Sequence, residues 1–194
     1  MNARAPRLLA LAAVAAIQLA VPVAMIVGHE RTLETGLQWR FRTEPVDPAD
    51  AFRGRYLALA FADTAAAVPA GVEIEAGDDV YVPLRRDAAG FAVLGPVALE
   101  PPATRDYLAV EVRWVDREQG APRAHVELPF GRLYLEEGVA PAAEKAYFEA
   151  VGRAGAPGAR PAWALVRVLD GRAVLEDVVV DGQPIRELVA GTAR

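Results

Sequence analysis

An uncharged run near the N-terminus constrains this chain more than any other feature. From Leu8 to Gly28 there is no charged residue, and Gln18 is a single polar interruption. As a helix this run would span about 31 Å, close to the thickness of the hydrocarbon core of a bilayer. Pro22 is compatible with that, because transmembrane helices tolerate proline where neighbours satisfy the freed carbonyl. We therefore expect residues 8–28 to span a membrane and to contact its lipid.

The charges before this run predict its orientation. Arg4 and Arg7 precede it, with no acidic residue. By the positive-inside rule, residues 1–7 stay cytoplasmic, and the rest crosses the inner (cytoplasmic) membrane. A cleaved signal peptide is the main competing interpretation, but the run is long for one and lacks an Ala-x-Ala site at its end. We favour a single-pass signal anchor at 8–28, a juxtamembrane linker at 29–36 and a periplasmic domain at 37–194; a buried soluble helix is the least favoured alternative.

Composition excludes several kinds of chemistry. The 194 residues include no Cys and no Ser, so disulfides, thiolate sites and serine nucleophiles are impossible. After Gly28 there are 19 basic and 26 acidic residues, a formal charge of −7. That charge argues against nucleic-acid binding and against adhesion to anionic lipid. An exported domain of this size must be stabilised by core packing.

Alternation of apolar and polar residues predicts a β-rich domain. In residues 37–42, Leu37, Trp39 and Phe41 share one face. Residues 55–61 can bury both faces, which is typical of a central strand. Pro83 favours an edge position for the strand at 80–84, which forms a hairpin with 91–94. Other strands are expected at 107–115, with Leu108, Val110, Val112 and Trp114 on one face, and at 124–128 (with 131–135 as its possible continuation), 162–169 and 172–180.

Turn residues and one helical segment complete this prediction. Asp170-Gly171 suits a two-residue type I′ hairpin turn, and Asp181-Gly182 marks a second turn. Pro141 is suited to a first helical position, and Gly152 can end that helix. The fold class is therefore mainly β with one short helix. A β-sandwich and a partly open barrel give the same alternation, so both remain open.

A motif around the second strand resembles a known family. The chain reads Asp-Pro-Ala-Asp at 47–50 and Gly-Arg-Tyr-Leu-Ala-Leu-Ala-Phe at 54–61. This resembles the GDYXXLXY family of bacterial membrane-anchored proteins, named for Gly-Asp-Tyr-x-x-Leu-x-Tyr and commonly preceded by an Asp-Pro-x-Asp turn. Segments 80–84, 133–138 and 166–182 extend the resemblance. It implies a membrane-anchored protein acting with a multi-pass membrane protein, and it supplies no reaction. The residues that carry the motif are Asp47, Pro48, Asp50, Gly54, Arg55 (in place of Asp), Tyr56, Leu59 and Phe61 (in place of Tyr).

The motif has a structural interpretation and a functional one. Structurally, the two aspartates would bond backbone amides and Gly54 would allow a bulge. Tyr56, Leu59 and Phe61 would then anchor the strand. Functionally, the turn and the position after Gly54 would belong to a site, although Arg55 weakens any version that needs a carboxylate there. We rate the structural interpretation ahead.

Other candidates are less specific. His29 is expected at the membrane exit. His125 alternates with Glu127 on a polar strand face, and Glu136 and Glu137 are adjacent, so on a strand they would point apart. Asp78 and Asp79 lie in an acidic patch without the spacing of a calcium loop. We predict no catalytic residue, metal or cofactor.

Three functional hypotheses follow. The leading one is a non-enzymatic, membrane-tethered interaction module with a multi-pass membrane partner. The second is an envelope enzyme that uses carboxylates, with or without a metal, on glycan or peptide. It requires several of Asp47, Asp50, Asp78, Asp79, Glu136 and Glu137 to converge. The third is a small-ligand barrel, which requires an apolar cavity.

Overall fold

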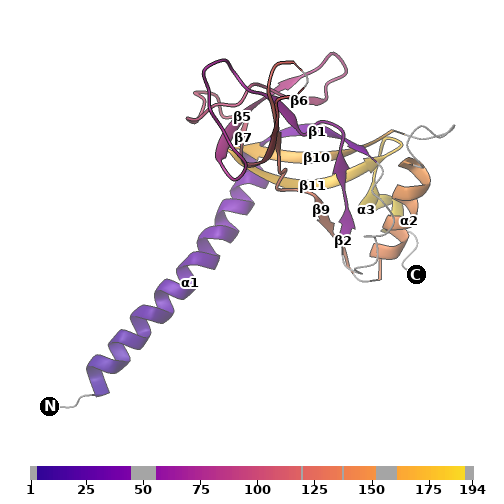
Figure 1. The fold of residues 1–194 in the computed structure, drawn as a ribbon. Coiled ribbons are helices and arrows are strands. Elements are labelled where there is room, and N and C mark those ends of the chain that lie inside the picture. The colour runs from indigo at the N-terminus through magenta and orange to yellow at the C-terminus, as the bar shows by residue number, and fades with distance from the viewer. Residues whose placement is uncertain (1–3, 45–55, 119, 137, 152–160, 191–194) are drawn as a thin grey trace.

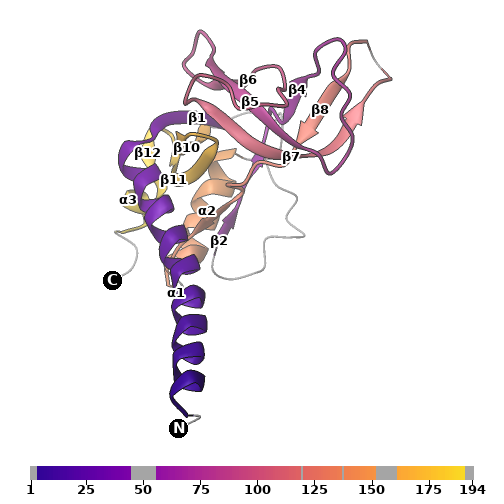
Figure 2. The ribbon, with the colours of Figure 1, turned by 90° about the vertical axis from the view of Figure 1, so that its left-hand side faces the viewer.

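The structure, a computed structural model, describes residues 4–44, 56–118, 120–136, 138–151 and 161–190. A long helix leads into a β-rich domain from which it projects (Figures 1 and 2). The elements are α1 (Arg4–Thr35), β1 (Leu37–Glu44), β2 (Tyr56–Ala58), β3 (Ala60–Phe61), β4 (Ala65–Ala67), β5 (Asp79–Arg86), β6 (Ala92–Leu94), β7 (Tyr107–Asp116), β8 (Arg123–Val126), β9 (Arg132–Tyr134), α2 (Ala140–Val151), β10 (Ala162–Leu169), β11 (Arg172–Val180), β12 (Gln183–Pro184) and α3 (Ile185–Ala190).

Helix α1 is long and apolar enough to cross a membrane over Ala13–Thr35. The large apolar side chains between Leu11 and Val27 are half or more exposed, which is costly in water and typical of a lipid-facing helix. The helix passes through Pro22 and continues to Thr35, so residues 29–35 of the expected juxtamembrane linker are helical. One residue, Gly36, then separates α1 from β1.

Five strands form what we call the anchor sheet, in the order β12-β11-β10-β1-β3. Strand β1 pairs antiparallel with β10 from Leu37↔Val168 to Arg42↔Trp163. The predicted hairpin is confirmed: Leu169 pairs with Arg172 around Asp170 and Gly171, whose φ angles of 48° and 85° fit a type I′ turn. Asp181-Gly182 also forms a turn with two positive φ angles, of 54° and 82°. Leu37, expected to be buried with Trp39 and Phe41, is instead 54% exposed beside the helix junction.

A second set of five strands, β4-β8-β7-β5-β6, forms a nearly closed barrel. The Val97 amide, which follows β6, donates to the Ala67 carbonyl at the end of β4 (2.9 Å), so the outer strands approach each other. Of the two architectures left open by the sequence, the barrel is correct. Pro83 does not mark an edge strand, because β5 lies between β7 and β6; Pro83 stands where the ladder with β6 ends.

A short ribbon and two helices complete the domain. Strands β2 and β9 form a two-stranded sheet, with Tyr56 opposite Tyr134. The expected central strand at 55–61 is therefore wrong: it breaks at Leu59 into β2 and β3, each with a different partner. Residues 131–135 likewise do not continue β8. Helix α2 matches the predicted helix and buries Tyr147 and Val151, whereas α3 was not predicted.

Candidate functional site

The end of α1 is packed against the anchor sheet. Thr32 is fully buried, and its hydroxyl donates to the Gly28 carbonyl (2.9 Å). The Gly36 amide donates to the Thr32 carbonyl (3.0 Å), and a Cβ on Gly36 would lie 2.4 Å from that oxygen and 3.0 Å from the Val168 carbonyl. Only glycine fits so close to two backbone segments. The chain passes from α1 into β1 at Gly36, where its backbone packs closely against Val168 of β10.

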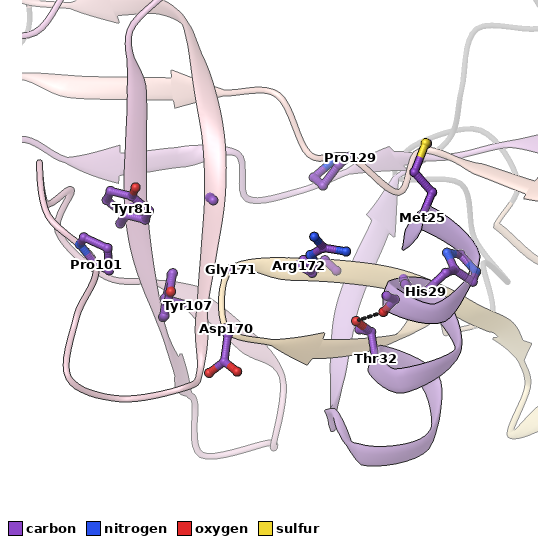
Figure 3. A pocket seen from close by; sticks show the side chains of 14 residues that line it. Met25, His29, Thr32, Tyr81, Pro101, Tyr107, Pro129, Asp170, Gly171 and Arg172 are labelled. Atoms are coloured by element: carbon purple, nitrogen blue, oxygen red, sulfur yellow. Dashed lines mark hydrogen bonds between the residues drawn. The ribbon is translucent and has the colours of Figure 1, made fainter. Parts of the chain in front are cut away.

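A cleft of ≈ 630 Å³ lies where α1 leaves the domain. Figure 3 shows Arg172 between the tip of the β10–β11 hairpin and α1, with Tyr81 and Tyr107 on the barrel side. Met25 and His29 line it from the helix. His29, expected at the membrane exit, lies within α1 and lines the same cleft as the Arg172 guanidinium. We call this hollow the anchor-side cleft.

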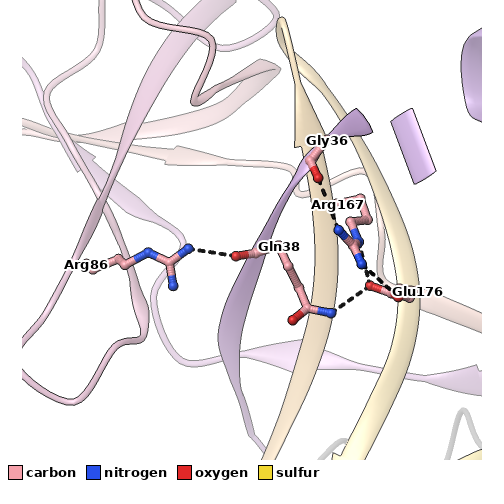
Figure 4. Close-up of polar contacts among 5 residues, drawn as sticks. All are labelled: Gly36, Gln38, Arg86, Arg167 and Glu176. Carbon is pink, nitrogen blue, oxygen red and sulfur yellow. Dashed lines mark hydrogen bonds and ion pairs between the residues drawn. The ribbon is translucent and has the colours of Figure 1, made fainter. Parts of the chain in front are cut away.

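Polar side chains connect β1, β10 and β11 of the anchor sheet (Figure 4). The Arg167 guanidinium donates to Glu176 (Nε–Oε2 2.8 Å) and to the Gly36 carbonyl (3.2 Å), and Gln38 also donates to Glu176 (2.9 Å). A β-bulge in β11 leaves Glu176 without an opposite residue, which frees it for these contacts. Chiefly because Arg167 donates to it, the pKa of Glu176 is lowered.

The pKa of the next residue, Asp177, is shifted in the opposite direction to that of Glu176. It is buried, and burial raises the pKa of its carboxyl, although the Val178 amide donates to it (2.8 Å) and Arg186 lies 4.0 Å away. Burial of a carboxylate disfavours its charged form, whereas a donated hydrogen bond favours it. Asp177 faces a single guanidinium at long range, and no second carboxylate is hydrogen-bonded to it among the described residues.

Leu59 and Phe61 of the family motif line a second cleft of ≈ 630 Å³. Leu59 is buried and Phe61 half-buried. Phe61 packs against Phe41 and Phe130, with ring centroids 6.2 and 5.2 Å away. The motif thus supports the core and borders a hollow. Asp47, Pro48, Asp50, Gly54 and Arg55 lie outside the described residues, so their interpretation remains a prediction.

Three exposed or half-exposed groups extend this second cleft along the β2–β9 ribbon. The Tyr56 and Tyr134 rings are 5.8 Å apart, and the Arg132 guanidinium lies 5.2 Å from the Tyr56 ring centroid. Tyr134 is 65% exposed. We call these three residues the tyrosine platform. Sequence reasoning missed Arg132 and Tyr134, because only strand pairing places them opposite the motif.

The secondary candidates are dispersed. His125 stacks on Trp114 (centroids 4.3 Å apart), and its neighbour Glu127 is paired with Arg113 (3.3 Å). A bulge in β7 turns Trp114 outward, which corrects the expectation that it faces the core. The Glu136 backbone carbonyl accepts the Val139 and Ala140 amides before α2.

The carboxylates of the enzyme hypothesis belong to different elements where they are described. Asp78 accepts the Glu75 amide (2.8 Å) in the turn before β5, and Asp79 begins that strand. Glu136 belongs to the segment before α2, and Glu137 lies outside the described residues. Within the described ranges, no three His, Asp or Glu side chains are grouped so as to hold a metal.

Together these features define a class of protein. It has a β-rich domain, made of a nearly closed barrel and a second five-stranded sheet, and an apolar N-terminal helix able to span a membrane. The family profile for GDYXXLXY proteins matches residues 18–178, so the chain belongs to the GDYXXLXY family. No curated protein and no solved structure matches it.

Proposed function

We propose that this protein is a membrane-anchored extracytoplasmic interaction module that acts with a multi-pass membrane protein. The observation that carries the proposal is the junction of α1 with β1, where one glycine separates the apolar helix from the anchor sheet. Backbone packing at Gly36 and burial of Thr32 favour a domain held in one orientation above the membrane. A flexible tether would instead need a polar linker.

The charges support the same topology. Arg4 and Arg7 precede the apolar run, which predicts that the N-terminus stays in the cytoplasm and that the acidic domain is exported from the inner membrane. This placement is tested by the mature N-terminus and by extraction of membranes with alkali. A mature chain that starts near His29, or one released by alkali, would contradict the anchor.

The tyrosine platform is the surface that we assign to the partner. Tyrosine and arginine are enriched in protein interfaces, because each combines a large apolar area with polar groups. Tyr134 is exposed and Tyr56 half-buried, and the platform borders the cleft of the family motif. A multi-pass membrane protein with periplasmic loops is the occupant that the family resemblance implies.

The test is photo-crosslinking in native membranes of the source bacterium. A benzophenone amino acid replaces Tyr134 in one variant and Trp114, an equally aromatic, 50% exposed residue on the barrel, in the control. We expect Tyr134 to yield an adduct whose peptides identify a multi-pass membrane protein, and Trp114 not to. Adducts with only this chain, or equal adducts from both positions, would contradict the proposal.

Nothing among the described residues favours the enzyme hypothesis. The described carboxylates belong to separate elements, while Asp47, Asp50 and Glu137 are outside the described residues. A raised carboxyl pKa at Asp177 stands alone. This hypothesis stays a prediction about the motif turn.

A further inference from the structure

We propose that the anchor-side cleft binds the phosphate of a phospholipid headgroup through Arg172. This inference rests on the membrane anchoring proposed above. It assigns to the domain a second membrane contact, separate from the helix. The ligand is one lipid of the extracytoplasmic leaflet, recognised by its phosphodiester.

The position of the cleft carries the first part of the argument. It is lined by Met25, within the uncharged run, and by His29 and Thr32, just beyond it. A helix that spans the bilayer with residues 8–28 therefore places this cleft at the level of the headgroups. At that level the cleft is within reach of lipid headgroups.

Arg172 carries the second part. Its side chain is exposed, and no hydrogen bond or ion pair of its guanidinium is found among the described residues. A Cβ on Gly28 would lie 2.1 Å from its Nη1, so the guanidinium lies against the backbone of α1 in space that glycine leaves open. A guanidinium presents a planar fork of donors that matches phosphate oxygens.

The nearby acid does not compete for Arg172. Asp170 is held by Arg105 in a two-pronged pair, with Nε–Oδ1 and Nη2–Oδ2 distances of 3.0 Å each. Because its charge is already matched, it repels an arriving phosphate less than a free carboxylate would. Tyr81 and Tyr107 line the opposite wall, and tyrosine is enriched at membrane interfaces.

An exposed apolar residue supports a lipid rather than a soluble phosphate. Leu99 is 57% exposed in the loop between Ala98, which is bonded to Tyr81, and Pro101, which lines the cleft. An exposed arginine near a loop that presents one exposed leucine, with Glu100 beside it, suits a molecule that carries both a phosphate and acyl chains. The exported domain is acidic, so this is a local contact, and we expect it to accept zwitterionic and anionic phospholipids alike.

Lipid retention by the full-length protein in detergent provides the test. Native mass spectrometry would follow titration with phosphatidylcholine, phosphatidylglycerol or inorganic phosphate. We expect both lipids to bind and inorganic phosphate not to, and Arg172→Gln to weaken lipid binding at least about tenfold. Arg172→Lys should lose less, because it keeps the charge without the fork. The matched control is Arg85→Gln, which removes another exposed arginine on the barrel.

Equal lipid binding by wild type and Arg172→Gln would overturn the proposal, as would equal losses in Arg172→Gln and Arg85→Gln. If Arg172→Gln unfolds, a second measurement decides. A nitroxide on Pro101→Cys, in a chain without other cysteines, reports accessibility to lipid-soluble oxygen in phosphatidylcholine vesicles. We expect it to exceed that of a label on Ala88→Cys in the β5–β6 turn. Equal, water-like values would overturn the proposal.

These outcomes are separable from failure of the anchor. Release of the protein by alkali would contradict the proposed anchoring. A protein that stays in the membrane but shows no Arg172-dependent lipid binding would contradict this inference alone.

Discussion

The anchor sheet and the barrel have the same number of strands but are assembled differently. In the anchor sheet, β1, β10 and β11 are eight or nine residues long, and tight turns of positive φ connect β10, β11 and β12. In the barrel, loops connect strands of three to ten residues, and one backbone bond from Val97 to Ala67 brings its edges together. The anchor sheet therefore suits a mechanical support for the helix, whereas the barrel depends on contacts between segments far apart in the sequence.

The two regions meet at the tip of the β10–β11 hairpin. The Ala109 amide of the barrel donates to the Gly171 carbonyl (2.9 Å), and Leu108 forms a bridge with Gly171. On the other side, Arg86 donates to the Gln38 carbonyl (2.8 Å). Because β strands of both regions share these contacts, we expect the domain to unfold as one unit.

Truncation of Leu108 should have the largest effect. The residue is fully buried at this joint, so Leu108→Ala should lower the free energy of unfolding by about 2–5 kcal/mol. Trp114 reports on the barrel and Trp163 on the anchor sheet, in variants that keep one tryptophan each. Both signals should shift to the same lower urea midpoint. A shift confined to Trp114 would show that the regions unfold separately.

The control for that variant is Leu99→Ala. Leu99 is 57% exposed, so in the absence of lipid its truncation should change the free energy of unfolding by no more than about 0.5 kcal/mol.

A pair of glycines sharpens the comparison at the joint. Gly171 and Gly182 have φ of +85° and +82°, so alanine at either costs about 1 kcal/mol in backbone strain. A Cβ on Gly171 would also lie 2.9 Å from a Tyr107 ring carbon, whereas Gly182 faces open space. We expect Gly171→Ala to cost about 1–2 kcal/mol more than Gly182→Ala in urea unfolding. Equal costs would mean that the barrel does not press on the hairpin.

The smallest expected effect concerns pH. Glu176 has a lowered pKa in the folded state, so its stabilising contribution is present above the unfolded value and is lost as pH falls through the folded one. Asp177 has a raised pKa, so stability falls as pH rises through it. Against wild type, Glu176→Gln should reduce the acid-side loss, by under about 1 kcal/mol because a third of its side chain is exposed.

The matched variant is Asp177→Asn, which should change the slope in the opposite sense. Urea midpoints between about pH 3 and pH 7 measure both variants. If both variants change the pH dependence of the urea midpoint in the same direction, the opposite pKa shifts of Glu176 and Asp177 are contradicted.

The same contrast explains what the sequence could predict. Asp-Gly turns and alternation are local signals, so they identified the β10–β11 hairpin and the β-rich class. Closure of the barrel and the pairing of β2 with β9 depend on contacts between distant segments, which no local pattern encodes. The segment 56–61 breaks at Leu59 because Tyr56–Ala58 pair with β9 whereas Ala60 and Phe61 pair with β1. Trp114 faces outward because of a bulge.

The candidate sites show the same limit. The motif predicts that Leu59 and Phe61 anchor a strand. In the structure Leu59 is buried between β2 and β3, and Phe61 packs against Phe130. Tyr134 lies in segment 133–138 of the family resemblance, but no sequence pattern placed it or Arg132 beside Tyr56. No local sequence pattern predicts the anchor-side cleft. Gly28 ends the apolar run and Arg172 follows the Asp-Gly turn, but the two lie far apart in the sequence. Only the packing of α1 on the hairpin brings them together.

A distance measurement in lipid vesicles tests the central claim, that helix α1 and the domain form one body. Nitroxides on Leu19→Cys in α1 and Ala89→Cys in the β5–β6 turn occupy exposed positions in a chain without native cysteine. Pulsed electron resonance should give one narrow distribution that matches the distance in the structure. A broad distribution, or loss of the Leu19 label through cleavage of the mature chain, would contradict a rigid anchor.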